Sequence, residues 1–242
     1  MNGYRCLTAA VLMVVGGAAV SAWNASMIHI RHNAGKKQCQ MKMARIYQGL
    51  TDYKNDHDNK LPDVALAEGS PYWMVGLQDD KSSSNTRPLW KIVKDGYVKP
   101  SSFLCSSRNN LSPLDLNDDQ IKNYHDFPGR AYITYSFQVN CSKTTREMKT
   151  RRAILADLSP LFEQIPNHTS QFVIQLNTQL KNSNSINHHR RGQNVLFCDG
   201  SVEYSKTRKV GINQDDIYTL ANTTLYTGVE QSTSEFDRFL AP

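Results

Sequence analysis

The sequence lacks the short motifs that mark several large enzyme classes. It has no Gly-x-Ser-x-Gly elbow, no phosphate-binding loop and no dinucleotide-binding glycine pattern. The net charge is +6, but the basic residues are dispersed along the sequence. An RNA-binding motif of aromatic and basic residues is also absent. We therefore predict that the protein is not an enzyme, needs no cofactor and does not bind nucleic acid.

Charged residues are absent from the run between Cys6 and Trp23 near the N-terminus. As a helix, this run is just long enough to cross a hydrocarbon core of about 30 Å. It is either a membrane anchor or a signal peptide, since Val20-Ser21-Ala22 makes an acceptable cleavage site before Trp23. Both alternatives export the rest of the chain, and the pattern that follows favours an anchor.

Proline is absent from Asn24 to Asp56, and apolar residues recur there at helical spacing. The steps of four, three, four and three predict one buried stripe made by Cys39, Met43, Ile46, Leu50 and Tyr53. If the anchor continues into this segment, a single helix of about 50 residues results. Asn59 and Pro62 are expected to close it.

The chain thus divides into three parts. We predict a leader and transmembrane segment over residues 1–23, an amphipathic helical spine over residues 24–60 and an extracytoplasmic domain over residues 61–242. Within that domain, residues 89–98 predict a short helix closed at Asp95-Gly96, and residues 130–139 and 151–158 predict strands. Residues 170–180 fit either a strand or a helix.

Asp199-Gly200 lies between two apolar runs and predicts a two-residue type I′ hairpin. In that register Phe197 faces Val202 and Val195 faces Tyr204. We expect these four side chains to meet the helical stripe at Met43, Ile46 and Leu50. The predicted fold is therefore α+β, with three to five largely antiparallel strands covered on one face by the N-terminal helix.

One segment around this hairpin carries a family resemblance. His189 is followed by nine residues and then by Asp199-Gly200, within GQNVLFCDGSVEY. The apolar run is followed by QCQMKMARIYQGLTDYKNDHDNKLP, and the middle of the chain contains LWKIVKDGYVKPSSFLC. The histidine is preceded by ITYSFQVN and AILADLSP. In this order the segments resemble the bacterial prepilin-like proteins that carry a processing-associated H-X9-DG domain, which are relatives of the type II secretion pseudopilins.

The resemblance implies a pilin-like fold and a structural role in a type II secretion or type IV pilus-like assembly. It implies cleavage by a prepilin peptidase between Gly3 and Tyr4, although Thr8 stands where such prepilins usually carry a glutamate that helps assembly. It also implies a single-pass protein of the inner (cytoplasmic) membrane whose C-terminal domain is extracytoplasmic. Its partners would be other pseudopilins, bound through the N-terminal helix.

The same resemblance implies how two of the cysteines pair. In an oxidising compartment, two disulfides in any of three connectivities can join Cys39, Cys105, Cys141 and Cys198. Cys39 and Cys105 lie in the two segments most like the family, which implies that they pair. The alternative is that the cysteines are buried thiols without a bridge.

Several side chains have the ligand types that suit zinc: Asp157, His168, His188, His189 and Asp199. Adjacent residues on a strand point to opposite faces, so His188 and His189 are not expected to share a metal. The chain also has no His-Glu-x-x-His or Cys-x-x-Cys pattern. We therefore predict no metal site, with His189 anchoring the hairpin through a buried hydrogen bond, Asp199 shaping the turn and His188 contributing little.

Two alternatives remain. The protein could be an exported metal-dependent hydrolase or a glycan-binding domain whose site includes His189 and Asp199. A calcium-binding loop over residues 115–126 is a second alternative, because oxygen ligands occur there at EF-hand-like offsets. These ligands are Asp115, Asn117, Asp119 and Asp126. Gln120 occupies the position where the calcium loop needs glycine, so a polar surface loop is the default prediction.

Overall fold

The computed structural model describes residues 2–64, 69–76, 84–108, 111–139, 151–166, 171–232, 234 and 236–242, with side chains from residue 23 onward except at residues 25 and 29. The described α-helices are α1 (Asn2–Asp56), α2 (Arg87–Lys94), α3 (Asp118–Asn123) and α4 (Thr178–Asn182). Short 3₁₀ helices are η1 (Pro100–Phe103), η2 (Arg130–Tyr132), η4 (Pro160–Phe162), η5 (Ile186–His188) and η6 (Ile212–Gln214). The strands are β1 (Tyr135–Gln138), β2 (Ala153–Asp157), β3 (Ile174–Gln175), β4 (Gln193–Phe197), β5 (Val202–Ser205), β6 (Leu225–Tyr226) and β7 (Leu240–Ala241).

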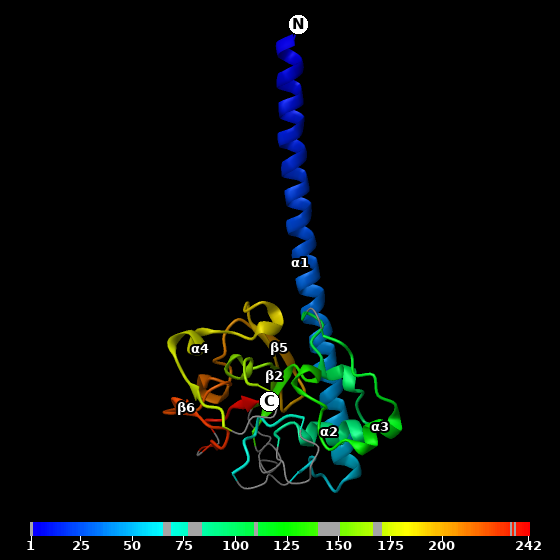
Figure 1. Ribbon diagram of the computed structural model, residues 1–242, viewed down its shortest axis with the longest axis vertical. Coiled ribbons are helices and arrows are strands. Elements are labelled where there is room, and N and C mark those ends of the chain that lie inside the picture. Colours follow the sequence, from blue (N-terminus) through cyan, green and yellow to red (C-terminus); the bar gives the residue numbers. More distant parts are fainter. Residues whose placement is uncertain are drawn as a thin grey trace.

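Helix α1 dominates the shape of the molecule. Its N-terminal part projects far beyond the globular domain, and its C-terminal part packs along that domain (Figure 1). The predicted stripe is confirmed, because none of its members exceeds 5% exposure: Cys39, Met43, Ile46, Leu50 and Tyr53. The helix ends at Asp56, and the following Asp58 and Asn59 adopt positive φ angles of 51° and 60°.

The predicted membrane anchor falls on residues 1–23. Of these, only Trp23 has a described side chain, and it is 69% exposed. Within the part of the chain that the structure describes, we find no helix that combines the length and the apolar character needed to cross a membrane.

Two glycines let α1 approach the domain closely. A Cβ atom on Gly35 would lie 2.2 Å from the Oγ atom of Ser107, and one on Gly49 would lie 2.1 Å from a methyl group of Val98. Each glycine costs helix stability, by up to about 1 kcal/mol relative to alanine. The close contacts explain what the helix gains at these two positions.

The main sheet has five strands in the order β5-β4-β2-β1-β7, and every neighbouring pair is antiparallel. A second sheet contains β3 and β6. The predicted α+β class is therefore confirmed, as are the strands in residues 130–139 and 151–158. The predicted short helix is α2, which is followed by a left-handed Gly96. The ambiguous segment 170–180 contains both β3 and the start of α4.

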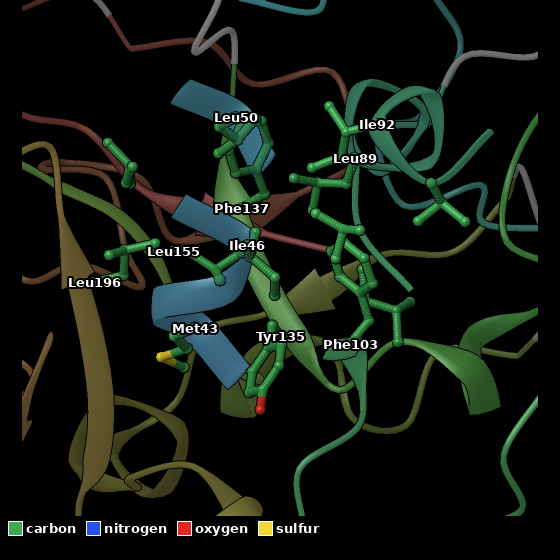
Figure 2. Close-up of a cluster of buried hydrophobic side chains, with 14 of the residues drawn as sticks. Met43, Ile46, Leu50, Leu89, Ile92, Phe103, Tyr135, Phe137, Leu155 and Leu196 are labelled. Atoms are coloured by element: carbon green, nitrogen blue, oxygen red, sulfur yellow. The ribbon is translucent and has the colours of Figure 1, made fainter. Parts of the chain in front are cut away.

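The side of the main sheet that faces α1 carries the larger part of the core. Figure 2 shows Met43, Ile46 and Leu50 of α1 among side chains that come from α2, η1 and three strands. Those labelled beside them are Leu89, Ile92, Phe103, Tyr135, Phe137, Leu155 and Leu196. The helix thus serves as a core element of the domain along its C-terminal half.

The hairpin between β4 and β5 differs from the prediction. Of the two expected turn residues only Gly200 has a positive φ, of 85°. The Gly200 N–H donates to the carbonyl oxygen of Phe197 at 2.9 Å, and the Phe197 N–H donates to that of Ser201 at 2.9 Å. This is a three-residue loop with a left-handed glycine, so the type I′ assignment is wrong.

The longer loop shifts the strand register by one residue, so that Leu196 rather than Phe197 pairs with Val202. Such a shift exchanges the two faces of a strand. Leu196 and Val202 therefore pack with the α1 stripe, whereas Val195 and Phe197 belong to a second core cluster. The expectation that Val195 and Phe197 meet the stripe is wrong for this reason.

Gly200 lies where the β4-β5 turn contacts Tyr47 of α1. We expect Gly200→Val to lower the free energy of unfolding by about 1–3 kcal/mol, because a β-branched residue resists this φ. A Cβ atom at this position would also lie 2.5 Å from the ring of Tyr47. Gly96→Val is the matched control: its φ is 84°, but a Cβ atom there meets nothing within 4 Å. Urea denaturation should show the larger loss for Gly200→Val, and equal losses would mean that the Tyr47 contact has no effect.

Candidate functional site

Four buried side chains with reactive or ionisable groups meet where α1 joins the sheet. The Sγ atoms of Cys39 and Cys105 lie 2.7 Å apart. The Nε2 atom of His188 lies 3.8 Å from the Sγ atom of Cys105 and 3.2 Å from an Oδ atom of Asp157. None of the four residues is more than 2% exposed. The cluster is therefore sealed from solvent.

The two cysteines come from segments far apart in the sequence. Cys39 lies in the buried stripe of α1, and Cys105 follows η1, where its N–H donates to the Oγ1 atom of Thr134 at 2.6 Å. The N–H of Ser106 donates to the Sγ atom of Cys39 at 3.2 Å, and the N–H of Ser107 donates to that of Cys105 at 3.4 Å. Both sulfurs therefore accept backbone hydrogen bonds, which favour negative charge on sulfur.

Asp157 holds the other half of the cluster together. One carboxylate oxygen accepts from the Asn194 N–H at 2.5 Å, and the other accepts from the Nδ2 atom of Asn187 at 2.9 Å. Its backbone carbonyl accepts from the hydroxyl of Tyr218 at 2.7 Å. Asp157 ends the buried strand β2 and thereby links β4, η5 and the segment after η6.

The charges of the cluster support one another. Burial alone would lower the pKa of His188, but hydrogen bonds to Asp157 and Cys39 and their negative charges raise it to about 9. The hydrogen bond from Cys105 lowers the pKa of Cys39 against the effect of burial, while the same bond and burial raise the pKa of Cys105. In the reduced pair these shifts favour loss of the proton from Cys39 over loss from Cys105, and the nearby carboxylate of Asp157 favours the protonated form of His188.

Two kinds of chemistry are open to such a group: metal binding and disulfide formation. Cys39, Cys105 and His188 form a set of metal-ligand types whose donor atoms all lie within 4.8 Å of one another. Tetrahedral zinc with bonds of about 2.3 Å to sulfur requires two sulfurs roughly 3.8 Å apart. The observed 2.7 Å is much shorter than that and is closer to a disulfide bond of about 2.05 Å. The geometry therefore fits a bridge better than a zinc ion.

The structure reverses the roles predicted for the two histidines. His188 is fully buried, whereas His189 is exposed and caps η5 in the left-handed region with a φ of 56°. The expectation that His189 forms the buried hydrogen bond and that His188 contributes little is wrong. The reason is local, because the pair lies at the end of a 3₁₀ helix and strand alternation does not apply. Asp199 shapes the turn as predicted, since it accepts from the N–H of Ser201 at 2.9 Å.

Two residues of the calcium alternative, Asn117 and Asp126, serve separate structural roles. Asn117 caps α3 in a reciprocal pair of hydrogen bonds with Gln120. Asp126 is fully buried and accepts from the hydroxyl of Thr86 at 2.7 Å and from the N–H of Gly76 at 3.2 Å. Burial raises the pKa of Asp126 to about 6. Its carboxylate thus holds buried loops together and does not belong to an exposed calcium loop.

Some predicted residues lie outside the described part of the chain. They are the side chains of Tyr4 and Thr8 near the predicted cleavage site after Gly3, together with Cys141 and His168. Cys198 is buried, and its Sγ atom accepts from the N–H of Arg152 at 3.4 Å.

The sequence identifies Asp157 only as a residue type that suits zinc. It does not predict that Asp157 lies at the centre of this cluster. A carboxylate at the end of the apolar run AILAD indicates that a buried partner is needed. That partner is His188, which lies 31 positions further along the chain.

No family model, curated protein or solved structure matches this chain.

The two adjacent histidines offer a matched test of the cluster. We expect His188→Ala to lower the free energy of unfolding by about 1–3 kcal/mol at pH 6, because it leaves buried partners unsatisfied. His189→Ala, at the exposed neighbour, should change it by less than about 0.5 kcal/mol. Because folding raises the pKa of His188 from 6.5 to about 9, its contribution is complete below pH 6.5 and is lost as the pH rises through 9.

Urea denaturation of the reduced protein between pH 6 and about 10 measures this difference. The gap between the parent and His188→Ala should narrow with rising pH. A gap that widens, or a larger loss for His189→Ala, would contradict the assignment.

Proposed function

We propose that this protein is a membrane-anchored, pseudopilin-like structural subunit of a type II secretion or type IV pilus-like assembly. The observation that carries the proposal is the asymmetric use of α1, which is a core element over its C-terminal half and projects from the domain over the rest (Figure 1). Its 55 residues correspond to a rod of about 80 Å. Such a rod is suited to joining a domain to something distant from it.

The projecting part of α1 presents apolar side chains. Trp23 is 69% exposed, and Ile28 and Ile30 are each 59% exposed. Trp23 and Ile30 are seven residues apart and lie on one face of the helix, whereas Ile28 lies on the other side. Apolar side chains thus meet water on two sides of α1, and covering partners are expected. We propose that the run before Trp23 lies in the membrane and that the helices of neighbouring subunits cover Ile28 and Ile30.

The remaining features of the proposal follow from the sequence resemblance. A prepilin peptidase would cut between Gly3 and Tyr4, which would make Tyr4 the first residue of the mature protein. The domain over residues 61–242 would lie outside the cytoplasm, attached to the inner membrane by a single span. The protein would then act through helix packing and surface recognition and not through catalysis.

Membrane fractionation with N-terminal sequencing tests the anchor. The full chain should stay in the membrane fraction after a carbonate wash and should begin at Tyr4. A soluble exported protein that begins at Trp23 would show instead that the apolar run is a signal peptide.

Photocrosslinking in membranes tests assembly through α1. A photoreactive residue placed at Ile30 should give adducts with a second copy of the chain or with another pilin-like subunit. The control places the same residue at Asp119, an exposed position on α3. If Ile30 gives no adduct beyond the Asp119 control, α1 does not mediate assembly.

A further inference from the structure

We propose that Cys39 and Cys105 form a disulfide that fastens α1 to the globular domain at the point where the helix begins to be buried. This inference goes beyond the proposed function, because it concerns the link between helix and domain whatever the helix is attached to. It rests on the placement of the two sulfurs and on the course of α1.

The two sulfurs are positioned by well-packed elements on both sides. Cys39 is fully buried in the stripe of α1, and Cys105 follows η1, whose Phe103 is also fully buried. Their Sγ atoms are 2.7 Å apart although the residues are separated by 66 positions in the sequence. A displacement of less than about 1 Å would bring them to the bonding distance of 2.05 Å.

The place of the link along α1 gives it a specific effect. Gly35 and Cys39 are the first buried positions among the described side chains of α1, while Ile28 and Ile30 before them are exposed. Cys39 therefore lies at the start of the packed half. A covalent bond there prevents the helix from separating from the segment after η1 within its first packed turns, where a pull on the N-terminus would act.

The chemistry requires an external disulfide, such as that of an oxidised thiol-disulfide oxidoreductase. The Cys39 thiolate attacks one of its sulfurs, forms a mixed disulfide and releases the other sulfur as a thiolate, which takes up a proton. Cys105 then loses its proton and attacks the Cys39 sulfur, which expels the second external thiolate, and this also takes up a proton. Two cysteine thiols are thereby oxidised with the loss of two electrons, and one external disulfide is reduced to two thiols.

Burial of the two sulfurs determines at which stage of folding the disulfide can form. Because neither sulfur is accessible in the packed structure, exchange takes place before α1 has docked fully or during local opening. Once α1 has docked, the same burial protects the bond from reductants.

Differential alkylation of the full chain in detergent tests the proposal. The protein is denatured without reductant, alkylated, then reduced and alkylated with a second reagent, and each cysteine is assigned by peptide mass spectrometry. We expect Cys39 and Cys105 to take only the second reagent and to appear as one linked peptide pair before reduction. Labelling of both by the first reagent, or a bridge from either to Cys141 or Cys198, would overturn the proposal.

Metal analysis of the same sample separates the remaining alternative. Stoichiometric zinc, together with Cys39 and Cys105 that both react with the first reagent, would show a metal site and no bridge. Thermal denaturation gives a second readout, in which reductant should lower the midpoint of the parent and of Cys198→Ser. The double variant Cys39→Ser, Cys105→Ser should show no effect of reductant, and a parent midpoint unchanged by reductant would also count against the bridge.

Discussion

Replacing Asp157 with alanine should lower the free energy of unfolding by about 3–5 kcal/mol, the range measured when one partner of a buried ion pair is removed. The carboxylate is fully buried and lies 3.2 Å from the Nε2 atom of His188. It also accepts hydrogen bonds from Asn194 and Asn187. The alanine variant leaves a buried imidazolium without its counterion and two donors without an acceptor.

Urea denaturation followed by tryptophan fluorescence measures this loss, since Trp73 and Trp90 are both buried. Asp119→Ala is the control, because this exposed carboxylate lies 3.8 Å from Lys122 at the surface. Its loss should be below about 1 kcal/mol. Similar losses for the two variants would mean that Asp157 does not hold the cluster together.

A second large effect is expected where α1 packs on the sheet. Ile46 is fully buried among side chains of the main core (Figure 2). We expect Ile46→Ala to lower the free energy of unfolding by about 2–5 kcal/mol, through lost burial and the cavity that remains. The same denaturation experiment measures it.

Met41 supplies the control on the same helix. It is 55% exposed, so Met41→Ala keeps the helix propensity of the variant while removing little buried surface. Its effect should stay within about 0.5 kcal/mol. If Met41→Ala proved as costly as Ile46→Ala, the face of α1 that packs on the domain would be wrongly assigned.

Much of the architecture could be predicted because it depends on local spacing. The stripe on α1, the short α2 with Gly96 after it and the strands β1 and β2 all follow from periodicity and turn residues within about ten positions of one another. The packing partner of the stripe was also predicted in outline, since an apolar sheet face requires a cover.

The β4-β5 hairpin marks the limit of such reasoning. Asp-Gly fits both a two-residue and a three-residue loop, and the choice between them shifts the register by one. The apolar pattern could not decide, because Val195, Leu196 and Phe197 are all buried. A strand that is buried on both faces carries no alternation from which its register can be read.

The buried cluster could not be predicted from spacing at all. Cys39, Cys105, Asp157 and His188 come from four separate elements or loops, and only tertiary packing brings them together. The resemblance implied that Cys39 and Cys105 are neighbours, but nothing in the sequence placed His188 beside them. The assumption of a strand at the histidine pair then assigned the buried role to the wrong residue.

Because α1 is continuous between Asn2 and Asp56, it fixes the angle by which the domain is rotated about the helix axis relative to the N-terminal part. Each residue of an α-helix adds about 100° of rotation and 1.5 Å of rise. One residue inserted between positions 24 and 34 would therefore turn the domain by about 100° relative to the N-terminal part, whereas seven would restore its direction to within about 20°. The number of residues in this stretch, and not only their chemistry, thus determines how the domain is rotated about the helix axis relative to the N-terminal part of α1.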